Sequence, residues 1–147
     1  MSKLVKFRMH DGQGGISGLA DVLALISEND WVWSILDFDG VGRVPGGLEY
    51  HEFRDKLLAT REGYVMSWSQ LQSFAGGIRQ CFDLLAVAVK ERDDLSPDRF
   101  AVDDFGGCLM TLSAIDSGSW EVVVGDDIDV DSSLTEKFRA RFAGEVS

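Results

Sequence analysis

The spacing of apolar positions predicts a strand, a helix and a second strand in the first part of the chain. Residues 4–9 alternate loosely between apolar and other side chains, as on a strand with one buried face. Ser17 is suited to cap a helix, and apolar residues recur at helical spacing around it: Ile16, Leu19, Val22, Leu23 and Ile26. We expect a helix over residues 17–28. The aromatic and β-branched run 31–38 predicts the next strand, which Asp39-Gly40 should end as a turn.

A second helix begins with a capping box. Ser67 is followed three residues later by Gln70, so each can satisfy a free backbone N–H of the first turn. We expect this helix to span residues 68–82, with one apolar face formed by Leu71, Phe74, Ile78 and Phe82. Gly76-Gly77 within it lowers helix propensity, by roughly 1 kcal/mol per glycine relative to alanine. We therefore expect another part of the backbone to approach closely there.

The C-terminal half predicts a three-strand meander and a closing helix. Three apolar runs are typical of strands: residues 84–89, 108–115 and 120–124. The last two are joined by the turn residues 116–119, which is a hairpin signal. Ser133 and Glu136 form a second capping box, which opens a helix over residues 133–142, and Gly144 should end it.

These elements together predict the fold class. A short helix is expected between residues 48 and 58 and a brief extended segment at residues 64–66. Residues 91–107 form a long acidic loop, with a helical turn expected after Ser96-Pro97. The sequence therefore predicts an α+β fold: a mixed or antiparallel sheet with a C-terminal three-strand meander and helices packed on it. At 147 residues we expect one globular domain over residues 1–147.

The negative charge is concentrated in one segment. The formal net charge is −11 at pH 7, and residues 91–131 hold twelve acidic residues against two basic ones, Arg92 and Arg99. Such a field repels nucleic acid and anionic membranes, so we expect neither as a partner. It attracts a basic protein and speeds its association. The same charge could serve solubility alone, and charge by itself does not separate these two interpretations.

The cysteines and the apolar runs bear on the compartment. Cys81 and Cys108 both lie in apolar surroundings, so we expect two buried, reduced thiols. The chain opens without a secretion signal, and its apolar runs fall short of the roughly 20 residues that a membrane helix needs. We expect a cytoplasmic protein.

Several short patterns resemble ligand sites but lack essential positions. Residues 12–17 are glycine-rich and stand between a strand and a helix, as a phosphate loop does, yet no nucleotide fingerprint is complete. The alternating acids of residues 127–131 begin like a calcium loop, but Ser132 and Phe138 replace its glycine and its bidentate glutamate. The histidines and cysteines do not have a zinc spacing. We expect no cofactor, no metal and no catalytic residue, and hence no enzyme.

Trp31 and Trp33 are two residues apart, so on a strand both side chains face the same way. One interpretation is a buried core. The other is an aromatic anchor for a protein partner, and the sequence leaves both open.

Two elements resemble immunity proteins of bacterial polymorphic-toxin and contact-dependent growth inhibition systems. The segment Ile115-Asp116-Ser117-Gly118-Ser119-Trp120-Glu121-Val122-Val123-Val124, followed by a polar loop and a helix at 134–142, is similar to their D-S-S-x-W-E-[VI] hairpin, acidic loop and helix ending L-x-x-x-F. Gly118 stands where a serine is usual. Trp68-Ser69-Gln70-Leu71 and a helix through Gln80 and Asp83 are similar to their W-x-x-L…Q-x-x-D pattern. These elements cover about a third of the chain.

The resemblance implies a non-enzymatic inhibitor that binds a cognate toxin domain in the cytoplasm of the producing cell. A toxin with a basic surface, such as a nuclease, would suit the acidic charge. The residues expected to bind it are the acids of the charged segment: Asp103, Asp104, Asp126, Asp127, Asp129 and Asp131.

Two other hypotheses stay open. One is an acidic nucleic-acid mimic or another protein-binding module of phage or plasmid origin. The other is a small enzyme whose site is scattered along the sequence. An immunity gene should directly follow the gene of a large secreted toxin, and a deep polar pocket would instead favour an enzyme.

Overall fold

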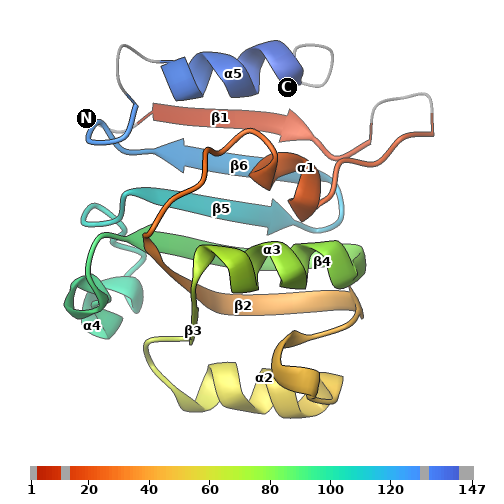
Figure 1. The fold of residues 1–147 in the computed structure, drawn as a ribbon, viewed down its shortest axis with the longest axis vertical. Coiled ribbons are helices and arrows are strands. Elements are labelled where there is room, and N and C mark those ends of the chain that lie inside the picture. The colour runs from red at the N-terminus through yellow and green to blue at the C-terminus, as the bar shows by residue number, and fades with distance from the viewer. Residues whose placement is uncertain (1–2, 11–13, 130–132, 143–147) are drawn as a thin grey trace.

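The computed structural model describes residues 3–10, 14–129 and 133–142, which form one six-stranded antiparallel sheet surrounded by helices (Figure 1). The strand order across the sheet is β1-β6-β5-β4-β2-β3. The strands are β1 Lys3–Arg8, β2 Val32–Gly42, β3 Tyr64–Met66, β4 Ile78–Val89, β5 Met110–Ile115 and β6 Ser119–Val124. The five helices are α1 Leu19–Leu23, α2 Tyr50–Ala59, α3 Trp68–Gly77, α4 Pro97–Phe100 and α5 Ser133–Arg141. The predicted α+β class is confirmed, and the sheet is antiparallel rather than mixed.

The predicted C-terminal meander is present. β4, β5 and β6 are neighbours in the sheet, with Ala86 opposite Leu112 and Leu112 opposite Val122. Asp116 and Ser117 have left-handed backbone angles, φ of 49° and 59°, which bend the chain tightly between β5 and β6. The hairpin signal in the sequence was therefore correct.

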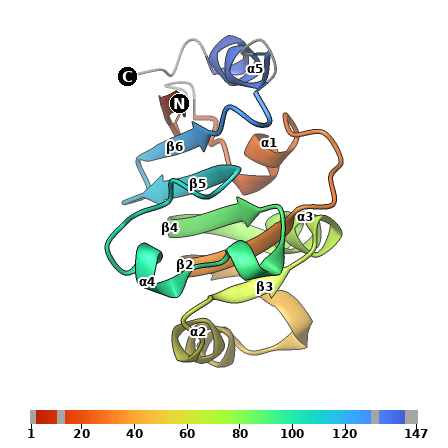
Figure 2. The ribbon, with the colours of Figure 1, turned by 90° about the vertical axis from the view of Figure 1, so that its left-hand side faces the viewer.

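One face of the sheet carries the main core. A row of buried residues crosses five strands: Val5, Val122, Leu112, Ala86 and Ile35. Figure 2 shows α1 and α3 lying over this face, while α4 lies on the other side of the sheet. A smaller cluster of Val87, Val89 and Leu95 is buried on that second face. Residues 91–108 thus cover part of a face that is otherwise open.

The predicted boundary between α3 and β4 was wrong. The capping box at Ser67 and Gln70 is present, but α3 ends at Gly77, and residues 78–82 belong to β4. The reason lies in β2, which does not end at a turn after Asp39 but continues to Gly42 through irregular pairing. Its last residues take residues 78–81 as their partners, and this pairing overrides the helical spacing of Ile78.

Of the other two predicted helices, the first is much shorter than expected, and the closing helix ends one residue early, at Arg141. The first helix is shorter than residues 17–28, because α1 begins after Gly18 and ends at Leu23. The closing helix α5 has its apolar face buried as expected, and the ring of Phe142 stacks on Phe7 with centroids 3.8 Å apart. The expected stop at Gly144 lies outside the described residues. No described helix is long and apolar enough to cross a membrane.

The close contact expected at Gly76-Gly77 involves only the second glycine. A Cβ added to Gly77 would lie 3.1 Å from the Cβ of Arg43, whereas one added to Gly76 would meet nothing within 4 Å. The tighter approach lies across the same junction at Gly42, where a Cβ would come within 2.3 Å of the Gly77 carbonyl oxygen. The strand end at Gly42 therefore packs directly against the end of α3.

Candidate protein-binding surface

The acidic segments of the sequence meet at one end of the sheet. Since the strands are antiparallel, the end of β4, the start of β5 and the end of β6 lie together, as the pairs Ala88–Met110 and Met110–Val124 show. The loops that leave and enter these strands are residues 91–109 and 125–129. Figure 1 places both at the left-hand end of the sheet. We call this region the acidic end.

The loop 91–109 is anchored to the sheet. It contains a 3₁₀ turn at Arg92–Asp94 and the single helical turn α4, which confirms the turn expected after Ser96-Pro97. The rings of Phe100 and Phe105 stack with centroids 5.4 Å apart and pack against the small cluster on the second face. The acidic side chains on this loop therefore project from a fixed backbone rather than from a free linker.

A hollow of about 490 Å³ lies between the two loops. Asp103 comes from the first loop, and Asp126 and Asp127 come from the second. The lining also includes Phe105, Gly106, Cys108, Met110, Thr111, Val123 and Gly125. Three of the predicted binding residues are thus brought together, and we call this feature the acidic hollow.

The three rim carboxylates are all on exposed residues. Asp103 has a left-handed backbone, with φ of 56°, a conformation that aspartate and asparagine adopt more readily than most residues. A cationic group entering the hollow would meet carboxylates from two sides.

Asp104 has a different role from its neighbour. Its carboxylate accepts hydrogen bonds from Arg99, at 2.8 Å from Nε and 3.1 Å from Nη2, and another from the Gly106 N–H at 3.1 Å. The hydrogen bond from Arg99 is the main reason that the pKa of Asp104 lies below its usual value. Because this pair is neutral overall, Asp104 adds less to the field of the acidic end than Asp103 does.

Asp129 is not a surface residue, so its predicted part in partner binding was wrong. It is only 7% exposed, and its carboxylate accepts hydrogen bonds from the Thr135 N–H at 3.0 Å and the Thr135 hydroxyl at 2.5 Å. The Lys3 ammonium lies 3.8 Å away. Burial alone would raise the pKa of Asp129, but these hydrogen bonds outweigh burial and lower it. Asp129 therefore stabilises the first turn of α5. The other predicted residue nearby, Asp131, lies outside the described residues.

Three other acids of the charged segment add little to the negative surface around the hollow. Asp116 lies in the β5–β6 turn, at the far end of the sheet from the hollow, and Glu121 lies on the open face, 3.7 Å from the Lys6 ammonium. At the acidic end itself, Asp98 forms an ion pair with Arg61. The negative surface is therefore smaller than the run of twelve acids in the sequence suggests.

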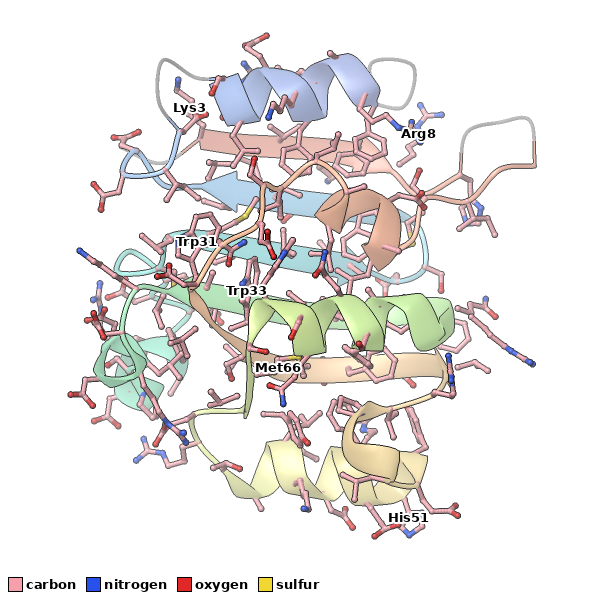
Figure 3. The ribbon with its side chains drawn as sticks, viewed as in Figure 1. Lys3, Arg8, Trp31, Trp33, His51 and Met66 are labelled. Atoms are coloured by element: carbon pink, nitrogen blue, oxygen red, sulfur yellow. The ribbon has the colours of Figure 1, made fainter. Side chains whose placement is uncertain are left out.

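The tryptophans belong mainly to the core. Trp33, Trp68 and Trp120 are buried, and the Trp120 indole donates a hydrogen bond to the Ser17 carbonyl at 2.8 Å. Trp31 is half-buried, with its ring centroid 6.0 Å from that of Trp33 (Figure 3). The core interpretation is correct for Trp33, and Trp31 packs against the same cluster.

The thiols are free but poorly ionised. Cys81 is buried and Cys108, in the acidic hollow, is only half-buried, so the expectation of two buried thiols holds for one. Burial raises the pKa of Cys81 to about 12 and that of Cys108 to about 11. Neither thiol is an activated nucleophile near neutral pH.

Side chains that could hold a metal ion were searched for among the described residues. Among them, no group of three or more His, Cys, Asp or Glu side chains is arranged to hold a metal ion. Residues 11–13 of the glycine-rich turn, and residues 130–132 at the end of the alternating acids, are not among the described residues. A second hollow of about 310 Å³ at the far end of the sheet is lined by residues that include His10, Arg79 and Cys81.

Comparison with protein-family models, with curated protein sequences and with solved structures gives no significant match to this chain. Sequence reasoning missed the uncharged residues of the acidic hollow: Phe105, Thr111 and Val123. The available signal was the polar Thr111 within the apolar run of β5. Alternate residues of a strand point to opposite faces of the sheet, so a polar residue between apolar ones indicates the face away from the main core.

Proposed function

We propose that this chain is an immunity protein that neutralises a cognate toxin domain by binding it, without catalysis. The observation that carries the proposal is the convergence of Asp103, Asp126 and Asp127 around one hollow at the acidic end. Like charges on neighbouring loops repel one another and lower the stability of a free protein. A basic partner removes that cost, so a binding surface accounts for the arrangement better than solubility does. The resemblance of the β5–β6 hairpin and α5 to immunity proteins supports the same function.

The partner should carry a basic surface. Attraction between unlike charges mainly raises the rate of association, and salt screens it over about 8–10 Å at physiological strength. Nuclease toxins have such surfaces because they hold phosphates. The acidic end would cover the phosphate-binding groove of the toxin or a region beside it, within the cytoplasm of the cell that makes both proteins.

The test begins with the gene directly upstream of the gene for this chain. The C-terminal domain of its product is expressed under a tight promoter, with and without this protein. We expect the toxin domain to stop growth and this protein to restore it, and we expect the two purified proteins to form a complex. Growth arrest that this protein does not relieve, with no complex in solution, would reject the proposal.

A charge variant then locates the surface. Asp103, Asp126 and Asp127 are changed together to asparagine, and association is followed by stopped-flow fluorescence at several salt concentrations. Exposed ion pairs contribute about 0.2–1 kcal/mol each, so we expect association to slow roughly tenfold and its salt dependence to weaken.

The matched control changes the same number of acids elsewhere, at Glu28, Asp55 and Asp116, none of which lines the hollow. It should associate almost as fast as the parent protein. Equal slowing in both variants would mean that net charge, and not the acidic end, guides binding. An acidic nucleic-acid mimic is distinguished by the partner, because it would bind many DNA-binding proteins instead of one cognate toxin.

A further inference from the structure

We infer that the acidic hollow is an anchor site for one arginine side chain of a basic protein partner. The inference rests on the proposed function only in naming that partner as the toxin. It adds the chemical group that the hollow receives and the residues that select it. Three features carry it: the two-sided acidic rim, the apolar lining, and a buried hydroxyl group without a hydrogen-bond partner among the described residues.

The lining suits the stem of a long cationic side chain. Phe105 and Val123 are half-buried and line the same hollow as the carboxylates. Long basic side chains bury their methylene stems on such surfaces while the charged head stays near polar groups. An arginine can also stack its planar head on an aromatic ring such as that of Phe105. The volume of about 490 Å³ accommodates this side chain together with part of its backbone.

Thr111 is the feature that points to a specific ligand. It lines the hollow and is only 6% exposed. Its neighbours across the sheet are Val87 and Val123, which offer no polar atoms from their side chains. Among the described residues its hydroxyl group has no hydrogen-bond partner. A buried polar group that is left unsatisfied costs about 1–3 kcal/mol, and a donor from a bound ligand would remove that cost.

The arrangement favours a guanidinium over a metal ion. The rim carboxylates stand on two loops, and no group of three or more described His, Cys, Asp or Glu side chains is arranged to hold a metal ion. A guanidinium has five N–H donors in a planar fork, so it can reach carboxylates on two sides and the Thr111 hydroxyl together. A lysine ammonium is a compact charge with three donors and meets fewer of these groups at once.

The experiment uses the full chain and small probes, and it does not require the toxin. The ¹⁵N–¹H NMR spectrum is recorded during titration with N-acetyl-arginine amide, with N-acetyl-lysine amide, and with N-acetyl-citrulline amide as the neutral equivalent of arginine. We expect millimolar binding of arginine with the largest shifts at Thr111, Val123 and Gly125. Citrulline should bind roughly tenfold more weakly, because three exposed carboxylates each contribute a few-fold.

Two variants separate charge from hydrogen bonding. Asp103→Asn combined with Asp126→Asn and Asp127→Asn should weaken arginine binding to the level of citrulline. Thr111→Val has nearly the same shape without the hydroxyl group, so the fold should persist and arginine should bind about three- to tenfold more weakly. Lysine binding should change less in the Thr111→Val variant. Equal affinity for arginine and citrulline, or shifts spread over the whole acidic end, would overturn the inference.

The outcomes also separate this inference from the proposed function. The protein could protect cells from the toxin encoded by the upstream gene and yet not bind arginine in the hollow. That result would disprove the anchor site and leave the immunity function standing. A protein that binds arginine but protects against no neighbouring toxin keeps the anchor site and loses the immunity function.

Discussion

The two ends of the sheet are built in different ways. At the acidic end, strands are joined by long loops whose carboxylates surround a hollow. At the far end, basic and acidic side chains lie together: Arg8 in β1, Arg43 after β2 and Arg79 near the start of β4, with Asp83 in β4 and Asp116 in the β5–β6 turn. Figure 3 marks Lys3 and Arg8 at the two ends of β1. The far end therefore carries both charges, whereas the charged residues that line the hollow at the acidic end are all acids.

Two glycines at the far end lie in close contact with the backbone of a neighbouring segment. A Cβ added to Gly40 would lie 2.4 Å from the Gln80 carbonyl oxygen, and one added to Gly42 would lie 2.3 Å from that of Gly77. The rim of the acidic hollow, in contrast, consists of exposed side chains. We therefore expect sequence changes on the rim to act on the proposed binding, and changes at Gly40 or Gly42 to act on folding.

The largest expected effect is at Gly42. Its φ of 141° lies in a region that other residues rarely adopt, and a methyl group there would collide with backbone atoms. Strain and overpacking each cost about 1–3 kcal/mol, so Gly42→Ala should lower the free energy of unfolding by about 3 kcal/mol or more. Urea denaturation followed by tryptophan fluorescence measures the change.

Gly76→Ala is the matched control for Gly42→Ala. It lies near the same junction, and an added Cβ would meet nothing within 4 Å. Its effect should stay within about 1 kcal/mol and can be stabilising, because alanine favours the helix. Equal losses of stability in both variants would contradict the idea that the close backbone contact at Gly42 stabilises the junction of β2 with the end of α3.

A smaller loss is expected at Asp129, a predicted surface acid that is buried. Replacing Asp129 by asparagine keeps its size but removes the charge that Thr135 and Lys3 contact. Hydrogen bonds to charged groups contribute about 1.5–3 kcal/mol, so we expect a loss of about 1–3 kcal/mol at pH 7. Asp127→Asn, on an exposed neighbour, should change stability by less than about 0.5 kcal/mol.

The pH dependence tests the same point. The pKa of Asp129 is lower in the folded protein than its ordinary value of 3.8, so the ionised form stabilises the fold above that pH. This contribution disappears as the pH falls below about 4, through the pKa of the folded state. The stability difference between the parent and Asp129→Asn should therefore be full at pH 7 and should shrink in acid. A difference that is constant from pH 7 to pH 2 would refute the role given to the carboxylate.

The smallest effect concerns the two thiols, which lie towards opposite ends of the sheet. Cys108 is half-buried in the acidic hollow and Cys81 is buried, so Cys108 should react several-fold faster with iodoacetamide at pH 8. Both should react more slowly than a free cysteine, because burial raises the pKa of each thiol. Mass spectrometry of timed samples gives the rates, and the Cys108→Ser variant identifies the faster site. Bound toxin should protect Cys108 and not Cys81.

Local patterns in the sequence predicted the elements that depend on neighbouring residues. The turn at Asp116-Ser117 and the capping box at Ser67 are decided by side chains a few positions apart, and both are present. The end of α3 was not predictable in this way. Ile78 continues the helical spacing of Phe74, but its backbone pairs with Gly42, a residue from another part of the chain. Long-range pairing of this kind leaves no local pattern.

The candidate site was predictable only in part. The acids of its rim were identified by their density in the sequence, but their surroundings decide which ones face solvent. Asp129 turns inward because Thr135 supplies two donors to it. The rest of the lining remained hidden because Thr111 and Val123 belong to continuous apolar runs, which do not show which residues face a hollow on the second face of the sheet.

The pairing of the first strand with the last has a consequence for synthesis of the chain. Val5 in β1 pairs with Val122 in β6, and the ring of Phe7 stacks on that of Phe142, directly after α5. At about 5–20 residues per second, a ribosome needs roughly 6 to 23 seconds to pass from one partner to the other. During that interval β1 emerges without its neighbour, and its edge is exposed to the crowded cell. Charged residues such as Lys6 and Arg8 on a strand edge oppose pairing with other chains, so we expect them to protect β1 until β6 has been synthesised.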